Sequence, residues 1–242
     1  QTVLGQWATA AKSNEITAIP ELLELLDLEG AVVTTDAMGC QTAIAAKIVE
    51  RNADYVLQVK GNQPKLEAEL MALFDECIRG DPHAAPSQMF EEVEQGHGRV
   101  ETRHCWMTTR IHSLPGADDA DKWAALSSAA CVESVRLIEG REQRERRYYI
   151  SSIGILDAER MLGYVRGHWG VENGLHWCLD VSFDEDRRRI RKGHGAENFS
   201  RLSRIGLNLL KQEQTVKVGI KSKRLNCGWD HDYLLKVLTQ GD

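Results

Sequence analysis

Short apolar runs alternate with helical patterns through the first third of the chain, and this alternation constrains the fold more than any other feature. The runs "AVVTTDA" (31–37) and "DYVLQVKGN" (54–62) are rich in β-branched and apolar residues and are bounded by glycine, which predicts buried strands. The segment "TVLGQWATA" (2–10) predicts a further strand. Helical patterns cover residues 13–30, 40–53 and 63–78. This βαβαβα order predicts an α/β fold, in which helices flank a parallel or mixed sheet.

The pattern changes after residue 85. Alternating residues and the turn signal "QGHG" (95–98) predict a β-rich insertion over residues 86–148, with a hairpin near its start. Helical patterns return over residues 149–225, including "FSRLSRIGLNLLKQEQ" (199–214). Residues 226–242 form a tail with a short helix. The predicted division is therefore 1–85, 86–148, 149–225 and 226–242.

Composition excludes several classes of protein. Hydrophobic residues make up 42 % of the chain and charged residues 27 %, as in an ordinary globular protein. No apolar run approaches the ~20 residues of a membrane helix. The six cysteines form no CxxC pair, which favours reduced cytosolic thiols over a disulfide framework. The first residues resemble neither a signal peptide nor a natural start, so we expect an internal piece of a longer protein.

Charge is unevenly distributed along the chain. The net charge is −6, but residues 136–224 hold 19 Lys and Arg against 12 Asp and Glu, a local balance of +7. Five of these cations are Arg187, Arg188, Arg189, Arg191 and Lys192. A basic stretch of this kind suits phosphate contacts, although a solvated charged face is the common explanation for such a run.

Two turns after predicted strands carry candidate functional residues. Asp36 ends "AVVTTD", and ligands of open α/β sheets gather at the carboxyl ends of strands. The alternative is that Asp36 only caps the next helix. Lys60 and Asn62 lie in the turn of "VKGNQPKL", which offers a cation and backbone N–H groups to a phosphate or is simply solvated.

The stretch "RGHWGVENGLHWCLD" (166–180) spaces His168, Glu172 and His176 four residues apart, with Asp180 extending the row. On a regular α-helix these residues share one broad face. A zinc site is disfavoured, because helical zinc motifs place two His four apart and here they are eight apart. Two interpretations stay open at this point. The row is a polar helix face, or Glu172 is one carboxylate of a Mg²⁺ site shared with Asp36.

Several of these segments together resemble one family. These segments follow one another along the chain: residues 12–66, "HGRVETR", "YYISSI", "RGHWGVENGLHWCLDVSFDEDRRRIR" and "ENFSRLSRIGLNLLK". They resemble bacterial insertion-sequence transposases of the ISAs branch, which includes the H-repeat-associated proteins of Rhs elements. The likeness covers nearly the whole chain. It implies a DDE transposase with a ribonuclease-H-like mixed sheet and a β-rich insertion before the last catalytic helix.

The resemblance also implies a mechanism. Three acidic residues of such a core bind two Mg²⁺ ions, for which Mn²⁺ can substitute, and these ions drive phosphodiester hydrolysis and strand transfer. Asp36 matches the second acidic residue and Glu172 the third. His168 lies where relatives carry a basic residue and is expected to contact phosphate. His176 and Asp180 are expected to support the metal ligands from behind.

The first acidic residue of the family lies upstream, in a segment resembling "DGK". We therefore expect this chain to hold two of three ligands, to lack a central strand and to be inactive by itself. The alternatives are a non-catalytic DNA-binding remnant and an unrelated metal-dependent nuclease. Expected partners are double-stranded DNA at element ends, target DNA and a second copy, with Lys60, Asn62, Arg166, His168 and the basic stretch at 187–192 on the DNA. The expected location is the bacterial cytoplasm, at the nucleoid when DNA is bound, with no membrane contact.

Overall fold

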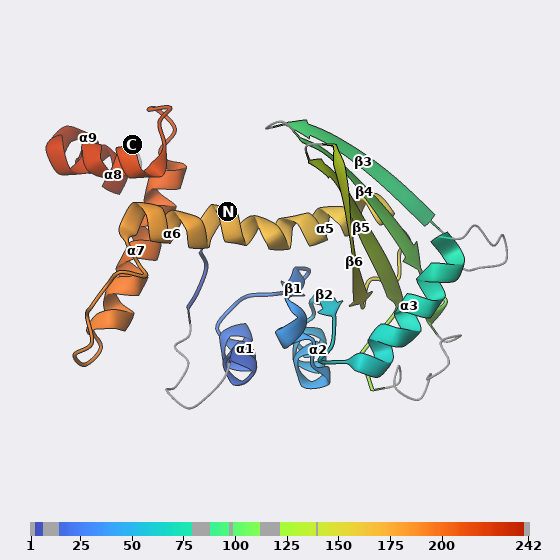
Figure 1. Ribbon diagram of the computed structural model, residues 1–242. Coiled ribbons are helices and arrows are strands. Elements are labelled where there is room, and N and C mark those ends of the chain that lie inside the picture. Colours follow the sequence, from blue (N-terminus) through green and yellow to red (C-terminus); the bar gives the residue numbers. More distant parts are fainter. Residues whose placement is uncertain are drawn as a thin grey trace. The chain divides into compact units, whose positions relative to one another are not determined.

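The computed structural model describes residues 3–6, 15–78, 88–96, 99–111, 122–138 and 140–239. The chain divides into two compact units. We call residues 9–168 the sheet unit, and residues 1–8 with 169–242 the helical unit. Figure 1 colours the chain along its sequence and labels the elements of both units.

A six-stranded mixed sheet forms the frame of the sheet unit, in the order β1-β2-β6-β5-β4-β3. Strand β1 (Val32–Thr35) pairs in parallel with β2 (Asp54–Val59). Five of the six residues of β2 are buried, as expected for a parallel strand that is covered on both faces. The predicted strands at 31–37 and 54–62 and the predicted α/β fold are confirmed.

The remaining strands form an antiparallel meander. They are β3 (Gln88–Gly96), β4 (Arg99–Thr108), β5 (Ser128–Ile138) and β6 (Arg141–Ser151). Strand β6 also pairs with β2, so all six strands belong to one sheet. The prediction that this region is mainly β is confirmed in the described residues, and the tip of the predicted hairpin, residues 97 and 98, lies outside them.

Helices cover the sheet and close its core. They are α1 (Glu15–Glu24), α2 (Thr42–Glu50), α3 (Pro64–Ile78) and the first part of α5 (Ala158–Val171). The main core joins Ile44 and Ile48 of α2, Leu70 and Phe74 of α3, and Leu57 of β2. Figure 1 shows α1 and α2 on one side of β1 and β2. A short 3-10 helix, η1 (Ala37–Gly39), links β1 to the segment before α2.

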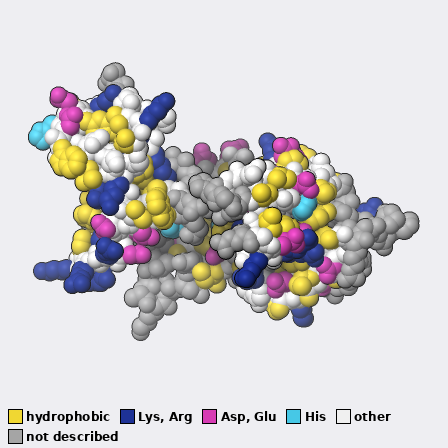
Figure 2. All heavy atoms as spheres, turned by 45° about the horizontal axis from the view of Figure 1, so that its top comes forward, with side chains coloured by type: hydrophobic (Ala, Val, Ile, Leu, Met, Phe, Trp, Pro, Cys, Tyr) yellow, Lys and Arg dark blue, Asp and Glu magenta, His cyan; other side chains and the backbone are white. Residues whose placement is uncertain are grey.

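The described residues of the helical unit form a series of helical elements after the end of α5. A π-helical segment, η3 (Glu172–His176), leads into α6 (Trp177–Phe183), and α7 (Gly195–Gln212), α8 (Ile220–Trp229) and α9 (His231–Thr239) follow. Its core is small, with Leu210, Tyr233 and Val237 at its centre. Several large apolar side chains of this unit are exposed instead of buried, among them Leu202, with 63 % of its surface accessible, and Trp229, with 77 %. Figure 2 shows these units with apolar and charged side chains interspersed. None of the helices within the described ranges is long and apolar enough to span a membrane.

A buried polar cluster connects α7, α8 and α9. The carboxylate of Glu213 accepts hydrogen bonds from the Thr215 backbone (2.6 Å) and from the Tyr233 hydroxyl (2.9 Å). Lys223 lies 3.4 Å from the same carboxylate and donates to the carbonyl of Leu210. Hydrogen bonds from Thr215 are the largest cause that lowers the pKa of Glu213, to about 2. Glu213 is therefore an anion held by several donors.

The predicted strand at 2–10 is wrong for its described part. Val3–Gln6 form no strand and lie instead against α7. The Val3 backbone N–H donates to the side-chain oxygen of Asn208 (2.9 Å), and the Asn208 amide donates to the Val3 carbonyl (2.8 Å). The Gln6 side chain donates to Ser200 (3.3 Å). A β-prone segment becomes a strand only where a neighbouring strand takes its backbone hydrogen bonds. Here the side chain of Asn208 takes the backbone hydrogen bonds of Val3 instead.

Candidate active site and DNA-contact residues

Asp36 is the first residue after β1 and is exposed at the edge of the sheet. The Gly39 backbone N–H donates to its Oδ1 (3.2 Å), so Asp36 caps the η1 turn. The capping interpretation is therefore confirmed, and it leaves lone pairs of the second carboxylate oxygen for other partners. A carboxylate oxygen is the ligand type that hard divalent cations prefer, so Asp36 fits one position of a Mg²⁺ site.

Close packing fixes the η1 turn over the end of β1. A Cβ added to Gly39 would lie 2.6 Å from Thr35 Cβ and 2.8 Å from Thr35 Oγ1. Only glycine permits this approach. Cys40, the next residue, is fully buried, and burial raises the pKa of its thiol to about 12. Cys40 is therefore a neutral thiol at neutral pH and not a reactive thiolate.

The turn after β2 lies at the same edge, because parallel strands end on the same side of a sheet. Lys60 is exposed there. Asn62 donates its side-chain amide to the carbonyls of Ala37 and Cys40 (3.4 Å to Cys40), and Gln63 donates to the Cys40 carbonyl (3.0 Å). The sequence indicated Asn62 as a residue of this turn that could contact phosphate, but not that its amide contacts the protein carbonyls beside Asp36.

The end of α5 contacts β1 through His168. Its Nδ1 lies 3.1 Å from Thr34 Oγ1, and Thr34 precedes Asp36 by two residues. Arg166, another predicted DNA contact, pairs with Glu92 (2.8 Å) and Glu94 (2.5 Å) of β3. Hydrogen bonds from Arg103 and Arg166 lower the pKa of Glu94. Within the sheet unit, Arg166 thus joins α5 to β3.

Glu172 begins the π-helical segment, and its side chain lies outside the described residues. Single π turns inside helices are frequent at functional sites. Because the wider turn replaces regular α geometry, the spacing argument for one shared face of His168, Glu172 and His176 does not carry over. His176 is exposed at the end of this segment, and Asp180 is half-buried in α6.

Lys211 of α7 was not identified from the sequence. Its ammonium donates to the Gly174 carbonyl (2.6 Å), inside the π segment. Helices depart from regular geometry at π turns and where a side chain enters the hydrogen-bond ladder, and both occur here. No sequence signal indicated this role, because a lysine in the last turn of a helix is expected on electrostatic grounds alone.

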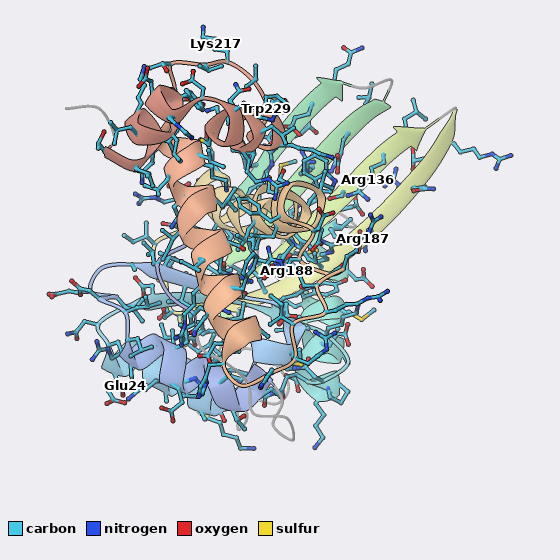
Figure 3. All side chains as sticks on the ribbon, turned by 90° about the vertical axis from the view of Figure 1, so that its left-hand side faces the viewer. Glu24, Arg136, Arg187, Arg188, Lys217 and Trp229 are labelled. Atoms are coloured by element: carbon cyan, nitrogen blue, oxygen red, sulfur yellow. The ribbon has the colours of Figure 1, made fainter. Side chains whose placement is uncertain are left out.

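The basic stretch before α7 divides into anchored and exposed side chains. Arg188 turns inward: it donates to the Phe183 carbonyl (2.9 Å) and to Ser203 Oγ (2.8 Å), and its guanidinium lies 4.2 Å from the centre of the Phe199 ring. Figure 3 labels Arg187 and Arg188 in this loop. The exposed members are Arg187, Arg189, Arg191 and Lys192, of which Arg191 also donates to backbone carbonyls of the loop.

An ion pair also supports the same loop. Arg204 of α7 lies 2.7 Å from the carboxylate of Glu185, which also accepts a hydrogen bond from Ser200 (2.7 Å). Burial tends to raise the pKa of Glu185, but the hydrogen bonds from Arg204 and Ser200 outweigh it and lower this pKa. The loop is therefore fixed to α7 at both Glu185 and Arg188.

No group of three or more His, Cys, Asp or Glu side chains with the arrangement of a metal site occurs among the described residues. Asp36 belongs to the sheet unit and Glu172 to the helical unit. Their predicted approach therefore stays a prediction.

The chain belongs to the transposase DDE domain family, whose sequence model matches residues 1–209. The resemblance inferred from the sequence is thereby confirmed.

Individual relatives agree with this family. The chain is 39 % identical over 246 residues to "H repeat-associated putative transposase YhhI" of Escherichia coli K12, covering 98 % of this chain and 62 % of the relative. It is 41 % identical over 249 residues to "Putative transposase YncI" of Escherichia coli O157:H7, covering 98 % of this chain and 60 % of the relative. It is also 39 % identical to "Putative protein YbfL" of Escherichia coli K12, with 98 % and 62 % covered. The chain thus spans about 60 % of the length of these curated relatives. No solved structure matches it.

Proposed function

We propose that this chain is part of the catalytic domain of a bacterial DNA transposase with a ribonuclease-H-like core, which cleaves and joins phosphodiester bonds at insertion-sequence ends. The observation that carries the proposal is the exposed Asp36 carboxylate at the carboxyl end of parallel strand β1, in a chain of the DDE family. This is where ligands of open α/β sheets bind.

Asp36 and Glu172 are the proposed ligands of Mg²⁺, and Mn²⁺ would substitute. Asp36 and Glu172 would hold the divalent ions, which would supply activation of the attacking water or 3′-hydroxyl and charge stabilisation at the leaving oxygen. The pairing rests on the resemblance to the family, in which Asp36 matches the second acidic residue and Glu172 the third. The proposed roles of His176 and Asp180 are to orient these ligands.

A direct measurement tests the pairing. Both carboxylates must lie about 2–2.5 Å from a shared cation, so bound Mn²⁺ should broaden NMR signals around Asp36 and around Glu172 together. Asp36→Asn and Glu172→Gln should each weaken Mn²⁺ binding. Broadening confined to one of the two regions would contradict a shared ion.

The exposed cations Lys60, Arg187, Arg189, Arg191 and Lys192 are the proposed phosphate contacts. Asn62, Arg166, His168 and Arg188 were predicted to contact DNA as well, but their described contacts are to protein groups, so we assign them weaker roles in DNA binding. Each phosphate contact steepens the fall of log affinity with log salt by about 0.9.

The expected partners are element ends and target DNA in the bacterial cytoplasm. Because an element has two ends, we also propose a homodimer on DNA, which light scattering with end DNA would measure.

Cleavage of the element's own terminal repeats tests the chemistry. We expect the 242 residues by themselves to show no strand cleavage with Mg²⁺ or Mn²⁺, because they bring two of the family's three acidic ligands. Losing such stabilisation costs several kcal/mol of barrier, and each ~1.4 kcal/mol is tenfold in rate. The full-length transposase should cleave, and its Glu172→Ala variant should not. Cleavage by the bare chain that disappears in Glu172→Ala would show that the site is complete without a third ligand.

A non-catalytic DNA-binding role is the second candidate. It is favoured by the basic loop, which is anchored through Arg188 and Glu185 within the helical unit and so does not depend on Asp36. The two candidates separate in one experiment. A full-length protein that binds end DNA, yet cleaves no better than its Glu172→Ala variant, has the second function.

A further inference from the structure

Two side-chain amides reach from the turn after β2 to the turn that carries Asp36. Asn62 donates to the carbonyls of Ala37 and Cys40, the latter at 3.4 Å. Gln63 donates to the Cys40 carbonyl at 3.0 Å. Both turns leave the sheet at the same edge because β1 and β2 run in parallel. The contacts therefore join two turns that are more than 20 residues apart in sequence.

The Cys40 carbonyl belongs to the residue that ends the short η1 helix, and the last carbonyls of a helix have no partner within the helix. The Ala37 carbonyl already accepts the Cys40 backbone N–H (3.2 Å), and the Asn62 amide is its second donor. Asn62 faces two carbonyl oxygens, so its NH₂ group and not its oxygen must point at them. A carboxylate at position 62 would repel the same carbonyls. Asparagine at position 62 therefore suits the two carbonyl partners, because its side chain carries an NH₂ donor.

The η1 turn in turn fixes Asp36. The Gly39 N–H donates to the Asp36 carbonyl (3.2 Å) and to Asp36 Oδ1 (3.2 Å). Any shift of the residues between 37 and 40 therefore moves the donor that orients the carboxylate. Gly39 is also in close contact with Thr35, so the turn is held by packing on one side and by the two amides on the other.

We propose that Asn62 and Gln63 are positioning residues that hold the Asp36 carboxylate in the direction needed to bind a divalent cation. This differs from the phosphate contact expected from the sequence for Asn62. The inference rests on the proposed function in one respect, which is that Asp36 is a metal ligand.

The test compares the full chain with the double variant Asn62→Ala/Gln63→Ala. Two amides are changed together because Asn62 is exposed and water would replace a single lost donor in part. Lys65→Ala is the control, since Lys65 is an exposed residue in the first turn of the neighbouring α3. Asp36→Asn is the reference for a lost ligand.

Two measurements are made on each variant. The first is amide hydrogen exchange at Gly39 and Cys40, which reports the η1 turn without any metal. The second is Mn²⁺ affinity, measured from the free Mn²⁺ signal in electron paramagnetic resonance. We expect exchange at these two amides to accelerate about tenfold in the double variant, as for the loss of about one net hydrogen bond. We expect Mn²⁺ affinity to fall several-fold, toward that of Asp36→Asn, and Lys65→Ala to change neither.

Each outcome decides one point. Unchanged exchange in the double variant would overturn the positioning role. Faster exchange with unchanged Mn²⁺ affinity, while Asp36→Asn weakens binding, would also overturn it, because the turn would then not control the ligand. If Asp36→Asn leaves Mn²⁺ affinity unchanged, it is the proposed function that fails, and faster exchange would still show that the amides hold the turn.

Discussion

Replacing Arg188 by alanine should destabilise the helical unit and should affect DNA binding much less than it affects stability. The guanidinium joins the loop to two helices: it donates to the Phe183 carbonyl at the end of α6 and to Ser203 of α7, and it lies over the ring of Phe199, also in α7, at 4.2 Å. Ser203 keeps its own donation to the Phe199 carbonyl (2.9 Å) in the variant, so the loss is confined to the arginine's contacts.

The size of the effect follows from these contacts. Two hydrogen bonds from a charged donor contribute on the order of 1–1.5 kcal/mol each in a partly exposed position, and a cation–π contact about 0.5–1 kcal/mol. Because Arg188 is half-buried and water compensates in part, we expect a loss of about 2 kcal/mol in the free energy of unfolding of the helical unit.

The matched control is the next residue along the chain. Arg189 is exposed, so Arg189→Ala should change stability by less than about 0.5 kcal/mol. It should instead lower the slope of log DNA affinity against log salt by about 0.9, the value for one phosphate contact. Hydrogen exchange of α7 amides measures the stability of this unit, and fluorescence anisotropy at several salt concentrations measures the slope.

The two variants should therefore have opposite signatures. If Arg188→Ala left α7 exchange unchanged and lowered the salt slope as Arg189→Ala is expected to, the anchoring role would be refuted. Arg188 would then be a phosphate contact like its neighbours, as the sequence alone suggested.

Two further predictions concern the Asp36 turn and the buried Glu213. Gly39→Ala should destabilise the sheet unit by about 1–3 kcal/mol, because the new Cβ would overlap Thr35, whereas Gly61→Ala, with nothing within 4 Å of its added Cβ, should be nearly neutral in urea unfolding. Equal effects of the two would show that the turn relaxes freely. The folded-state pKa of Glu213 is lowered to about 2 from 4.5, so its stabilising contribution is complete above pH 4.5 and is lost as pH falls toward 2. Urea midpoints of the wild type should therefore drop between pH 4.5 and 2 more than those of Glu213→Gln, and parallel pH profiles would rule out this linkage.

The first part of the fold was predictable because local signals and tertiary packing agree there. The apolar run ending in Asp36 and the run ending at Lys60 form β1 and β2, and both are followed by the predicted helices. In a parallel sheet, strands covered on both faces need continuous apolar residues, so the pattern is visible in the sequence itself. The position of Asp36 at a strand end follows directly.

What the sequence did not determine was the partner of each polar side chain. An asparagine, an arginine or a histidine has the same character in the sequence whether it faces DNA or a protein carbonyl. Contacts between residues far apart in sequence decided that Asn62 holds the η1 turn, that Arg166 pairs with β3 and that Arg188 anchors the loop before α7. The π segment at Glu172 likewise has no sequence signature.

The segment Val3–Gln6 shows most directly which features the sequence determines and which the tertiary structure decides. Its residues are β-prone, and the sequence alone predicted a strand. Only the tertiary structure decided that Asn208 and Ser200 of α7, about 200 residues later, would take its hydrogen bonds. Sequence determines which groups must be satisfied, and the three-dimensional neighbours determine how, because a backbone N–H can donate to, and a backbone carbonyl can accept from, any partner with suitable geometry.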